Sequence, residues 1–285
     1  MSQIPDMPQT TSDVPPGDRV KPILSVITPT YNSMRYFKET VDSVLQLGIP
    51  YEWILVDDCS SDGTVEYVQG LARSNANIVL LRNETNLCRP PKSYARGLGV
   101  ARGRYVLFLD HDDTIAASAV QNAVEKLKES PGPRVAISKV AYMDAASHVY
   151  KVKTIPFARY GARISGKRLF WTLLFSPTYP LKQGAVVIDR EILAEVGALF
   201  DIEFMLAASL HTDFLLLDAV GLNYRNVGSS YSSKLRLRDQ ECYWIRLVNT
   251  YVPGNLPGLR LFFRTYKWML GWGKISYSCI SSRRI

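Results

Sequence analysis

Residues 104–114 read RYVLFLDHDDT, a run of strand-forming residues that ends in three carboxylates and a histidine. Neighbouring carboxylates raise one another's pKa unless a cation lies between them. Asp110 and Asp112 are two positions apart, so a turn can direct both side chains to one ion. Their hard oxygens suit Mg²⁺ or Mn²⁺. The stretch therefore predicts a strand that ends at a divalent-metal site, with Asp113 capping a helix from 115 onward. The alternative is a solvated loop that caps this helix.

Strand-like and helix-like stretches alternate on both sides of this segment. Buried strands are predicted at 23–29, 51–58, 77–83, 104–110 and 133–142, and helices at 33–47, 60–72, 91–101 and from 115 onward. Such alternation is typical of βαβ units, which form a mainly parallel sheet with helices on both faces. Further along, we expect a strand at 184–189 with a short helix after it, a helix at 210–221 and a final strand at 222–227.

Three of the predicted strands end in polar clusters: PTYNS (29–33), DDCSSDG (57–63) and DHDD (110–113). In open α/β sheets, ligands bind outside the carboxyl ends of the strands. The three clusters are therefore expected to form one site. By contrast, GARISGKR (161–168) matches only part of a phosphate-binding loop, because Arg168 stands where that loop needs Ser or Thr. We interpret it as a basic surface loop.

Composition limits the class of protein. The chain has 285 residues, of which 47% are hydrophobic and 21% charged, as in folded globular proteins. Its four cysteines are far apart and form no CxxC pair, which favours neither a zinc site nor a disulfide framework and fits a reducing cytosol. The sequence has no signal-peptide pattern and no apolar run of about 18 residues. We therefore expect no membrane span.

The charge is concentrated at the C-terminal end. Residues 229–285 hold ten Lys/Arg against two Asp/Glu, which equals the whole formal charge of +8. Aromatic residues lie between these cations, a pattern that favours contact with an anionic membrane surface. The alternative is a helical extension packed on the body. Nucleic-acid binding is disfavoured, since no RNA-binding or zinc motif is present. Residues 1–22 are expected to form a disordered leader.

Four stretches occur in an order that resembles family 2 glycosyltransferases: SVITPTYNS, VDDCSSDGT, NLCRPPKSYARGLGVARGRYVLFLDHDD and GAVVIDREILAEVG. The resemblance covers about residues 23–227. It implies a Rossmann-like GT-A domain over 23–228, and a metal-dependent, inverting transfer of sugar from a UDP- or dTDP-sugar to a glycan or lipid-linked acceptor. Such an enzyme would build surface polysaccharide at the cytoplasmic face of the plasma membrane. The segment ECYWIRLVNTYVP is loosely similar to the bacterial rhamnosyltransferase branch.

The resemblance also implies roles for individual residues. Asp110 and Asp112 would hold Mn²⁺ or Mg²⁺, and the His111 side chain is expected to point away from the ion although His111 belongs to the donor-binding segment. The nucleotide-sugar donor would be held by Pro29, Thr30, Tyr31, Asn32, Asp57, Asp58, Arg89, Lys92, Arg96, Asp110 and His111.

The catalytic base departs from the family pattern. Leu210 and His211 stand where the family often carries Glu-Asp, and Asp213 follows. An imidazole with a pKa near ~6.5 can accept a proton at neutral pH, which favours His211 as the base. The alternatives are Asp213 or no base at all. On a helix, the side chains at 211 and 213 point to different faces, so we expect only one to serve. A chain without a base would be a non-catalytic sugar-nucleotide-binding subunit.

Overall fold

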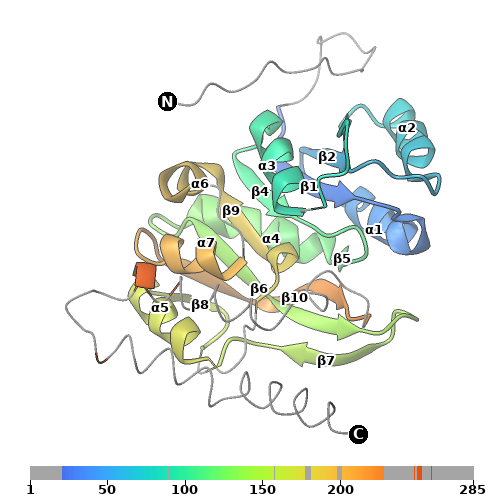
Figure 1. Ribbon diagram of the computed structural model, residues 1–285. Helices are drawn as coiled ribbons and strands as arrows, with labels where there is room; N and C mark the ends of the chain where they lie inside the picture. Colours follow the sequence, from blue (N-terminus) through green and yellow to red (C-terminus); the bar gives the residue numbers. More distant parts are fainter. Residues whose placement is uncertain are drawn as a thin grey trace, which may run out of the picture.

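The computed structural model of the chain describes residues 21–88, 90–156, 158–176, 181–197 and 201–227, together with 247, 249–251 and 258. Arg89, the expected leader up to residue 20 and most of the C-terminal extension lie outside the described residues. The described part contains one large sheet with helices around it (Figure 1).

The first half of the chain is a regular alternation of strands and helices. In order, its elements are β1 (Leu24–Thr30), α1 (Met34–Leu45), β2 (Tyr51–Asp57), α2 (Thr64–Ser74), β3 (Ile78–Arg82), α3 (Pro90–Val100) and β4 (Tyr105–Phe108). The four strands are parallel in the order β3-β2-β1-β4. These elements confirm the predicted ones, because buried aliphatic runs specify parallel strands that are covered on both faces.

The second half extends the sheet with strands of both directions. Its elements are β5 (Thr114–Ile115), α4 (Ala117–Glu129), β6 (Val135–Met143), β7 (Val149–Lys153), β8 (Ala162–Ile164), α5 (Gly166–Phe175), η1 (Gln183–Ala185), β9 (Val186–Asp189), α6 (Arg190–Val196), α7 (Asp201–Ala208) and β10 (Phe214–Arg225). β9 is antiparallel to both β4 and β6, and β6 is parallel to β10. β4, β6 and β10 therefore run in the same direction.

Two hydrophobic layers cover the two faces of the sheet. One contains Tyr94 of α3 and Leu173 of α5 together with residues of α6 and α7. The other contains Phe37 of α1 and Val124 of α4. The predicted α/β class with helices on both faces is confirmed. The packing fixes the strand ends, so polar residues there are held by a rigid scaffold.

One element differs in kind from the prediction. The expected helix at 210–221 is wrong, because residues 214–225 form the long strand β10, which also includes residues 222–225 of the final strand predicted at 222–227. The run FLLLD has no period that separates a buried strand from a buried helix. Backbone pairing decides between them: Phe214–Leu216 pair with β6 on one side and with β8 on the other.

Two loop predictions also need correction. Asp113 does not cap α4, whose N-cap position is Ala116, because the Asp113 carboxylate is buried and bonded elsewhere. GARISGKR is not a surface loop. Its first half forms β8, and the Ser165 hydroxyl accepts a hydrogen bond from the Arg168 N–H at the start of α5.

Two of the described residues of the C-terminal extension pack on the body. Leu247 is buried in the hydrophobic layer that contains α3 and α5, and Tyr251 packs against the same layer. At these two positions the extension packs on the body, as in the second of the two alternatives considered for it. Within the part of the chain that the structure describes, no helix is long and apolar enough to cross a membrane.

Candidate functional site at the carboxyl edge of the sheet

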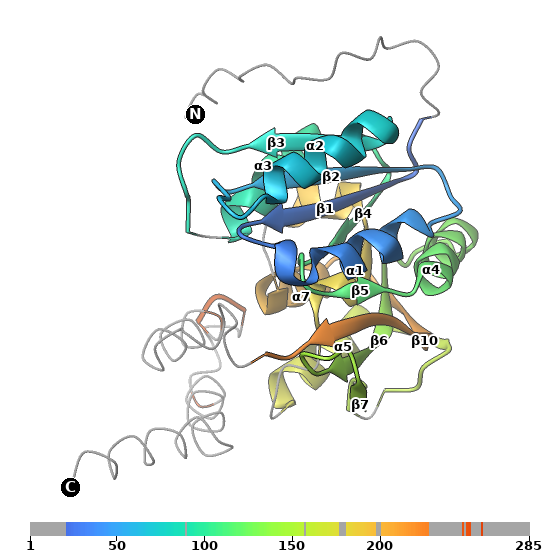
Figure 2. The same ribbon diagram turned by 90° about the vertical axis from the view of Figure 1, so that its right-hand side faces the viewer.

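The three polar clusters lie at one edge of the sheet. Thr30 at the end of β1 pairs with Asp57 at the end of β2, and Ile27 pairs with Phe108 at the end of β4. Asp110 follows Phe108 by two residues, which puts it about level with Pro29 along the strands. Figure 2 shows that β1 and β10 point to the same side of the molecule. The predicted convergence of the clusters is confirmed.

Asp57 and Asp58 are buried at the end of β2, and each accepts several hydrogen bonds. Asp57 accepts from the Thr30 hydroxyl at 3.3 Å and from both the hydroxyl and the backbone N–H of Ser60, at 2.5 and 3.1 Å. A carboxylate has about four acceptor positions. About one position on Asp57 is therefore left for a ligand hydroxyl or base.

Asp58 organises the loop after β3. Its oxygens accept from Asn83 Nδ2 at 2.7 Å and from the backbone N–H groups of Leu87 and Cys88 at 2.8 and 3.2 Å. Arg96, expected to contact the donor, donates instead to the Arg82 carbonyl at 2.6 Å and to Asn83 Oδ1. Arg96 thus orients Asn83, which in turn donates to Asp58. Lys92, the other α3 residue expected to contact the donor, is exposed.

The loop after β1 is joined to the loop after β2. Asn32 has a left-handed backbone with φ of 48°, and its Oδ1 accepts from the Ser61 N–H at 2.9 Å. Its own N–H donates to Ser60 Oγ at 3.0 Å. Pro29 and Thr30 are buried, whereas Tyr31 is 49% exposed. Tyr31 is therefore the aromatic side chain that this loop offers to a bound base.

The carboxylates of the DHDD turn are partly buried and repel one another. Asp110 Oδ1 accepts from the Tyr94 hydroxyl at 2.6 Å, and burial together with this carboxylate holds the pKa of Tyr94 well above its usual value. Burial, with the charge of Asp110 as an additional cause, also raises the pKa of Asp112. These are the conditions that a bound cation relieves.

Asp110 and Asp112 fit a divalent ion that is shared with a substrate. Both are half-buried and stand at the predicted edge. Within the described residues there is no group of three or more His, Cys, Asp or Glu side chains that could hold a metal by themselves. Mg²⁺ is usually held by one or two carboxylates, with waters and substrate phosphates as its other ligands. The pair of carboxylates suits that arrangement.

His111 and Asp113 anchor the turn. The Thr40 hydroxyl of α1 lies 2.8 Å from the His111 carbonyl and 2.7 Å from the Asp113 carbonyl, and its single hydrogen can be donated to either. Asp113 is 2% exposed, and burial followed by the charges of Asp110 and Asp112 raises its pKa well above its usual range. Its Oδ1 accepts from the backbone N–H of Arg225 at 2.8 Å.

Arg225 is a residue of the site that the sequence analysis missed. Its fully buried guanidinium donates to the Asp112 carbonyl at 2.9 Å, to Glu39 Oε2 at 2.7 Å and to Ser147 Oγ at 2.9 Å, and stacks on the Tyr36 ring at 4.3 Å. The sequence did contain an indication of this role, because Arg225 lies near the carboxyl end of the predicted last strand, and the other site residues also follow the carboxyl ends of predicted strands.

His211 and Asp213 lie at the opposite edge. Phe214 pairs with Val135, the first residue of β6, and Thr212 Oγ1 accepts from the Arg134 N–H at 3.1 Å. Both contacts belong to the amino ends of strands. The structure therefore does not bring His211 or Asp213 to the edge that carries Asp110, because residues 214–225 form a strand rather than a helix.

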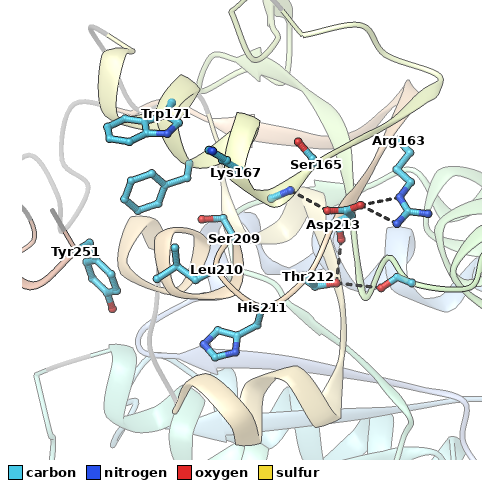
Figure 3. A pocket seen from close by; sticks show the side chains of 13 residues that line it. Arg163, Ser165, Lys167, Trp171, Ser209, Leu210, His211, Thr212, Asp213 and Tyr251 are labelled. Atoms are coloured by element: carbon cyan, nitrogen blue, oxygen red, sulfur yellow. Dashed lines mark hydrogen bonds and ion pairs between the residues drawn. The ribbon is translucent and has the colours of Figure 1, made fainter. Parts of the chain in front are cut away.

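Asp213 has a structural role at that edge. Its Oδ1 accepts from the Gly166 N–H at 2.9 Å and its Oδ2 pairs with Arg163 at 2.7 Å, and these contacts hold the pKa of its carboxyl below the usual value. His211 is exposed beside a cavity of about 690 Å³, which Lys167, Trp171 and Tyr251 also line. Figure 3 shows the imidazole turned away from Asp213.

Comparison with known proteins gives the site a family context. A model of the family "Glycosyl transferase family 2" matches residues 25–189. A putative teichuronic acid biosynthesis glycosyltransferase of Bacillus subtilis, TuaG, is 39% identical over 110 residues, which cover 38% of this chain and 43% of that protein. The poly(ribitol-phosphate) β-N-acetylglucosaminyltransferase TarS of Staphylococcus aureus is 37% identical over 108 residues, 37% of this chain and 19% of that protein. The matches thus span less than half of these relatives.

Solved structures share the fold. TarS residues 1–349 in complex with UDP-GlcNAc matches with a TM-score of 0.64 and 23% identity, over 79% of this chain and 65% of that chain. A mannosyltransferase of Pyrobaculum calidifontis in complex with GDP-Man and Mn²⁺ matches with a TM-score of 0.59 and 17% identity, over 96% of this chain and 79% of that chain. At this level of identity the likeness shows the fold alone.

Proposed function

The chain belongs to glycosyl transferase family 2, whose model covers more than half of it, and on that premise we propose that it transfers a sugar from a UDP- or dTDP-sugar to a hydroxyl of a glycan or lipid-linked acceptor. The acceptor would belong to a cell-surface polysaccharide. The relatives named for teichuronic acid synthesis and for poly(ribitol-phosphate) support this class of product.

The observation that carries the proposal is the convergence of three strand ends. Asp57 and Asp58 lie beside the exposed Tyr31, and Asp110 and Asp112 lie at the end of the next strand but one. In the complex that we propose, a nucleoside would lie over β1 and β2 and a diphosphate over β4. The Mn²⁺ in the complex of the Pyrobaculum calidifontis mannosyltransferase with GDP-Man supports the use of a divalent ion.

The proposed chemistry is one displacement at the anomeric carbon. The acceptor oxygen would attack the anomeric carbon from the face opposite the diphosphate, so that the bond to the diphosphate breaks as the new bond forms and the anomeric centre is inverted. The hydroxyl proton would pass to water, because neither His211 nor Asp213 lies at this edge. Mn²⁺ or Mg²⁺, held by Asp110 and Asp112, would stabilise the charge on the leaving nucleoside diphosphate. Tyr94 orients Asp110 through its hydroxyl.

A panel of UDP-, dTDP- and GDP-sugars tests the proposal. Each donor is added with Mn²⁺ or Mg²⁺, thermal stabilisation is measured, and release of the nucleoside diphosphate is then followed with the donors that bind. Stabilisation by one donor class that needs the metal, and is absent from Asp110→Asn, is the expected result. Equal stabilisation of the wild type and of this variant would contradict the metal site.

A second candidate is favoured by the position of His211 and Asp213. Since neither lies at the edge of Asp110, neither is positioned to take a proton from an acceptor there, as expected of a subunit that binds a sugar nucleotide without turning it over. Metal-dependent donor binding without release of the nucleoside diphosphate, across a full acceptor panel, would establish this alternative.

We also propose that residues 229–285 bring the protein to the cytoplasmic face of the plasma membrane. Their net charge of +8 and their aromatic residues support it. Flotation of the full chain with phosphatidylglycerol vesicles, compared with phosphatidylcholine vesicles, tests the idea. Equal flotation with both lipids would contradict an electrostatic contact.

A further inference from the structure

Two lysines and two tyrosines form a continuous cluster beside the DHDD turn. Lys182 Nζ lies 4.1 Å from the centre of the Tyr224 ring, and Lys153 Nζ lies 4.6 Å from the centre of the Tyr142 ring. The two rings meet edge to face with centroids 5.2 Å apart. The order Lys182–Tyr224–Tyr142–Lys153 is therefore a row of contacts, with one ammonium group at each end.

The row stands at the same edge as the metal turn. Tyr142 and Tyr224 pair with each other near the carboxyl ends of β6 and β10, and those strands run in the direction of β4. The residue after Tyr224 is Arg225, whose N–H donates to Asp113. Lys182 directly precedes η1 and β9, at the end of β9 that faces this edge.

Neither lysine forms an ion pair with another of the residues that the structure describes. Among the ion pairs of the described residues, the neighbouring Lys139 pairs with Asp218 and Arg225 pairs with Glu39, whereas Lys153 and Lys182 have no carboxylate within ion-pair distance. Both are half-buried. Burial, with the charge of Lys182 as a second cause, lowers the pKa of Lys153. At longer range, the charge of Lys182 lowers the pKa of Asp113, so the carboxylates of the DHDD turn offset part of its charge. The two ammonium groups still repel one another without a direct ion-pair partner, and a bound anion would stabilise both.

The position of the row in the sheet indicates whether the anion belongs to the donor or to the acceptor. Across the sheet the order is β3-β2-β1-β4-β9-β6-β10. On the proposed function, on which this inference rests, the nucleoside lies at β1 and β2 and the diphosphate at β4. The Lys153–Lys182 row lies beyond β4 on the far side from the nucleoside, where the acceptor must approach the sugar. We propose that Lys153 and Lys182 bind a phosphate group of the acceptor, so that the acceptor is a phosphate-bearing glycan or lipid.

The test separates an acceptor phosphate from the donor diphosphate. The full-length protein is first saturated with Mg²⁺ and the nucleoside diphosphate that the donor panel selects, and glycerol 3-phosphate is then titrated calorimetrically, with glycerol as the uncharged control. The wild type is expected to bind glycerol 3-phosphate and not glycerol. The double variant K153Q/K182Q is expected to lose at least about tenfold in affinity for glycerol 3-phosphate, while nucleoside diphosphate affinity stays within about twofold.

Two control variants accompany this test. K126Q/K128Q removes the same charge from the exposed end of α4 and is expected to bind like the wild type. K153R/K182R keeps both charges and is expected to retain glycerol 3-phosphate binding, which shows that charge rather than folding is responsible.

Two outcomes overturn the inference. In one, K153Q/K182Q loses nucleoside diphosphate affinity and keeps that for glycerol 3-phosphate, so the lysines serve the donor. In the other, glycerol 3-phosphate does not bind, or binds all variants equally, so no phosphate subsite exists. If no nucleoside diphosphate binds the wild type, the proposed function itself fails, which is a separate result.

Discussion

The backbone N–H of Arg225 donates to Asp113 Oδ1 at 2.8 Å, and this bond ties the last residue of β10 to the turn that carries Asp110 and Asp112. The two residues are 112 positions apart in the chain. The Arg225 side chain continues the link to the Asp112 carbonyl and to Glu39 of α1. Arg225 is thus placed to fix the geometry of the metal turn without contacting the ion.

Arg225→Lys is expected to loosen that turn. Lysine keeps the charge but cannot reproduce the fork of donors to four acceptors. We expect a loss of about 3 kcal/mol of stability, or roughly 6–12 °C in Tm, and a weaker response to Mn²⁺. Calorimetric melting with and without Mn²⁺ and donor measures both effects. Arg134→Lys, at the amino edge, is the matched control. An equal loss of Mn²⁺ response in both variants would show that Arg225 does not position the metal turn.

Tyr94→Phe is expected to weaken metal binding without unfolding the protein. The variant deletes the hydroxyl that donates to Asp110 at 2.6 Å. Loss of such a hydrogen bond to a metal-ligating carboxylate costs about 10–100-fold in metal affinity or activity. The Mn²⁺ concentration for half-maximal donor stabilisation gives the measurement.

Tyr105→Phe is the control for this prediction. Within the described residues, the buried Tyr105 hydroxyl of β4 has no hydrogen-bond partner. Its removal is expected to leave Mn²⁺ affinity unchanged. Equal Mn²⁺ affinities for the two variants would show that the Tyr94–Asp110 bond does not support the ion.

His211→Ala is expected to leave sugar transfer within about twofold of the wild type. The reason is position: residues 211–213 lie at the amino ends of β6 and β10, on the other edge from Asp110. Release of the nucleoside diphosphate at saturating donor measures it. A loss of about a hundredfold in the rate of sugar transfer, typical of a missing general base, would show that His211 is catalytic after all.

Asp213→Ala is expected to affect stability rather than chemistry. The variant removes the acceptor of the Gly166 N–H at the start of α5 and the partner of Arg163. Loss of a helix N-terminal acceptor costs about 1–2 kcal/mol, which corresponds to roughly 2–8 °C in Tm. Thermal melting tests this, with Asp218→Ala, an exposed carboxylate paired with Lys139, as the comparison. An unchanged Tm together with lost activity would be the opposite of the expected result.

Glu39→Gln is expected to change how stability depends on pH. Burial raises the pKa of Glu39, but hydrogen bonds from Ser147 and Arg225 outweigh it, and the pKa lies below its usual value of 4.5. Because the folded pKa is lowered, the unfolded state takes up the proton first as pH falls. The stabilisation is therefore complete above about pH 4.5 and lost as pH falls through the lower folded pKa.

The variant tests this sign directly. At pH 7, Glu39→Gln is expected to melt about 2–4 °C below the wild type, a loss of about 1 kcal/mol after allowance for solvent screening of this half-exposed side chain. The difference should shrink as pH is lowered below 4.5. Glu125→Gln, exposed on α4, controls for the general loss of a negative charge. A difference in Tm between the wild type and Glu39→Gln that grows as the pH falls would show that the pKa of Glu39 is not lowered in the folded state.

The sequence was most informative where a single local property was sufficient. Runs such as ILSVITP and RYVLFLD can be buried on both faces only as central strands, so β1 and β4 were identified correctly. Polar residues directly after such strands must lie at one edge of a parallel sheet. That rule placed Asp57 and Asp110 in one site before any contact was known.

Prediction from sequence failed where the partner of a segment decided its structure. Residues 214–217 suit a helix or a strand equally, and only pairing with β6 and β8 makes them β10. With that assignment His211 lies at the far edge. Arg225 could not be given a role either, because its acceptors come from α1, the DHDD turn and the loop after β6.

The sequence by itself determined the alternation of strands and helices, the family and the edge on which the carboxylates meet, since hydrophobic periodicity and short motifs are local properties of the chain. Only the tertiary structure decided which charges are partnered. It joins Arg225 to Asp113 across 112 residues and, within the part of the chain that the structure describes, leaves Lys153 and Lys182 on their tyrosines with no carboxylate at ion-pair distance. The physical reason is that a buried charge is stabilised by whatever the fold brings within a few ångströms, and sequence distance does not limit that choice.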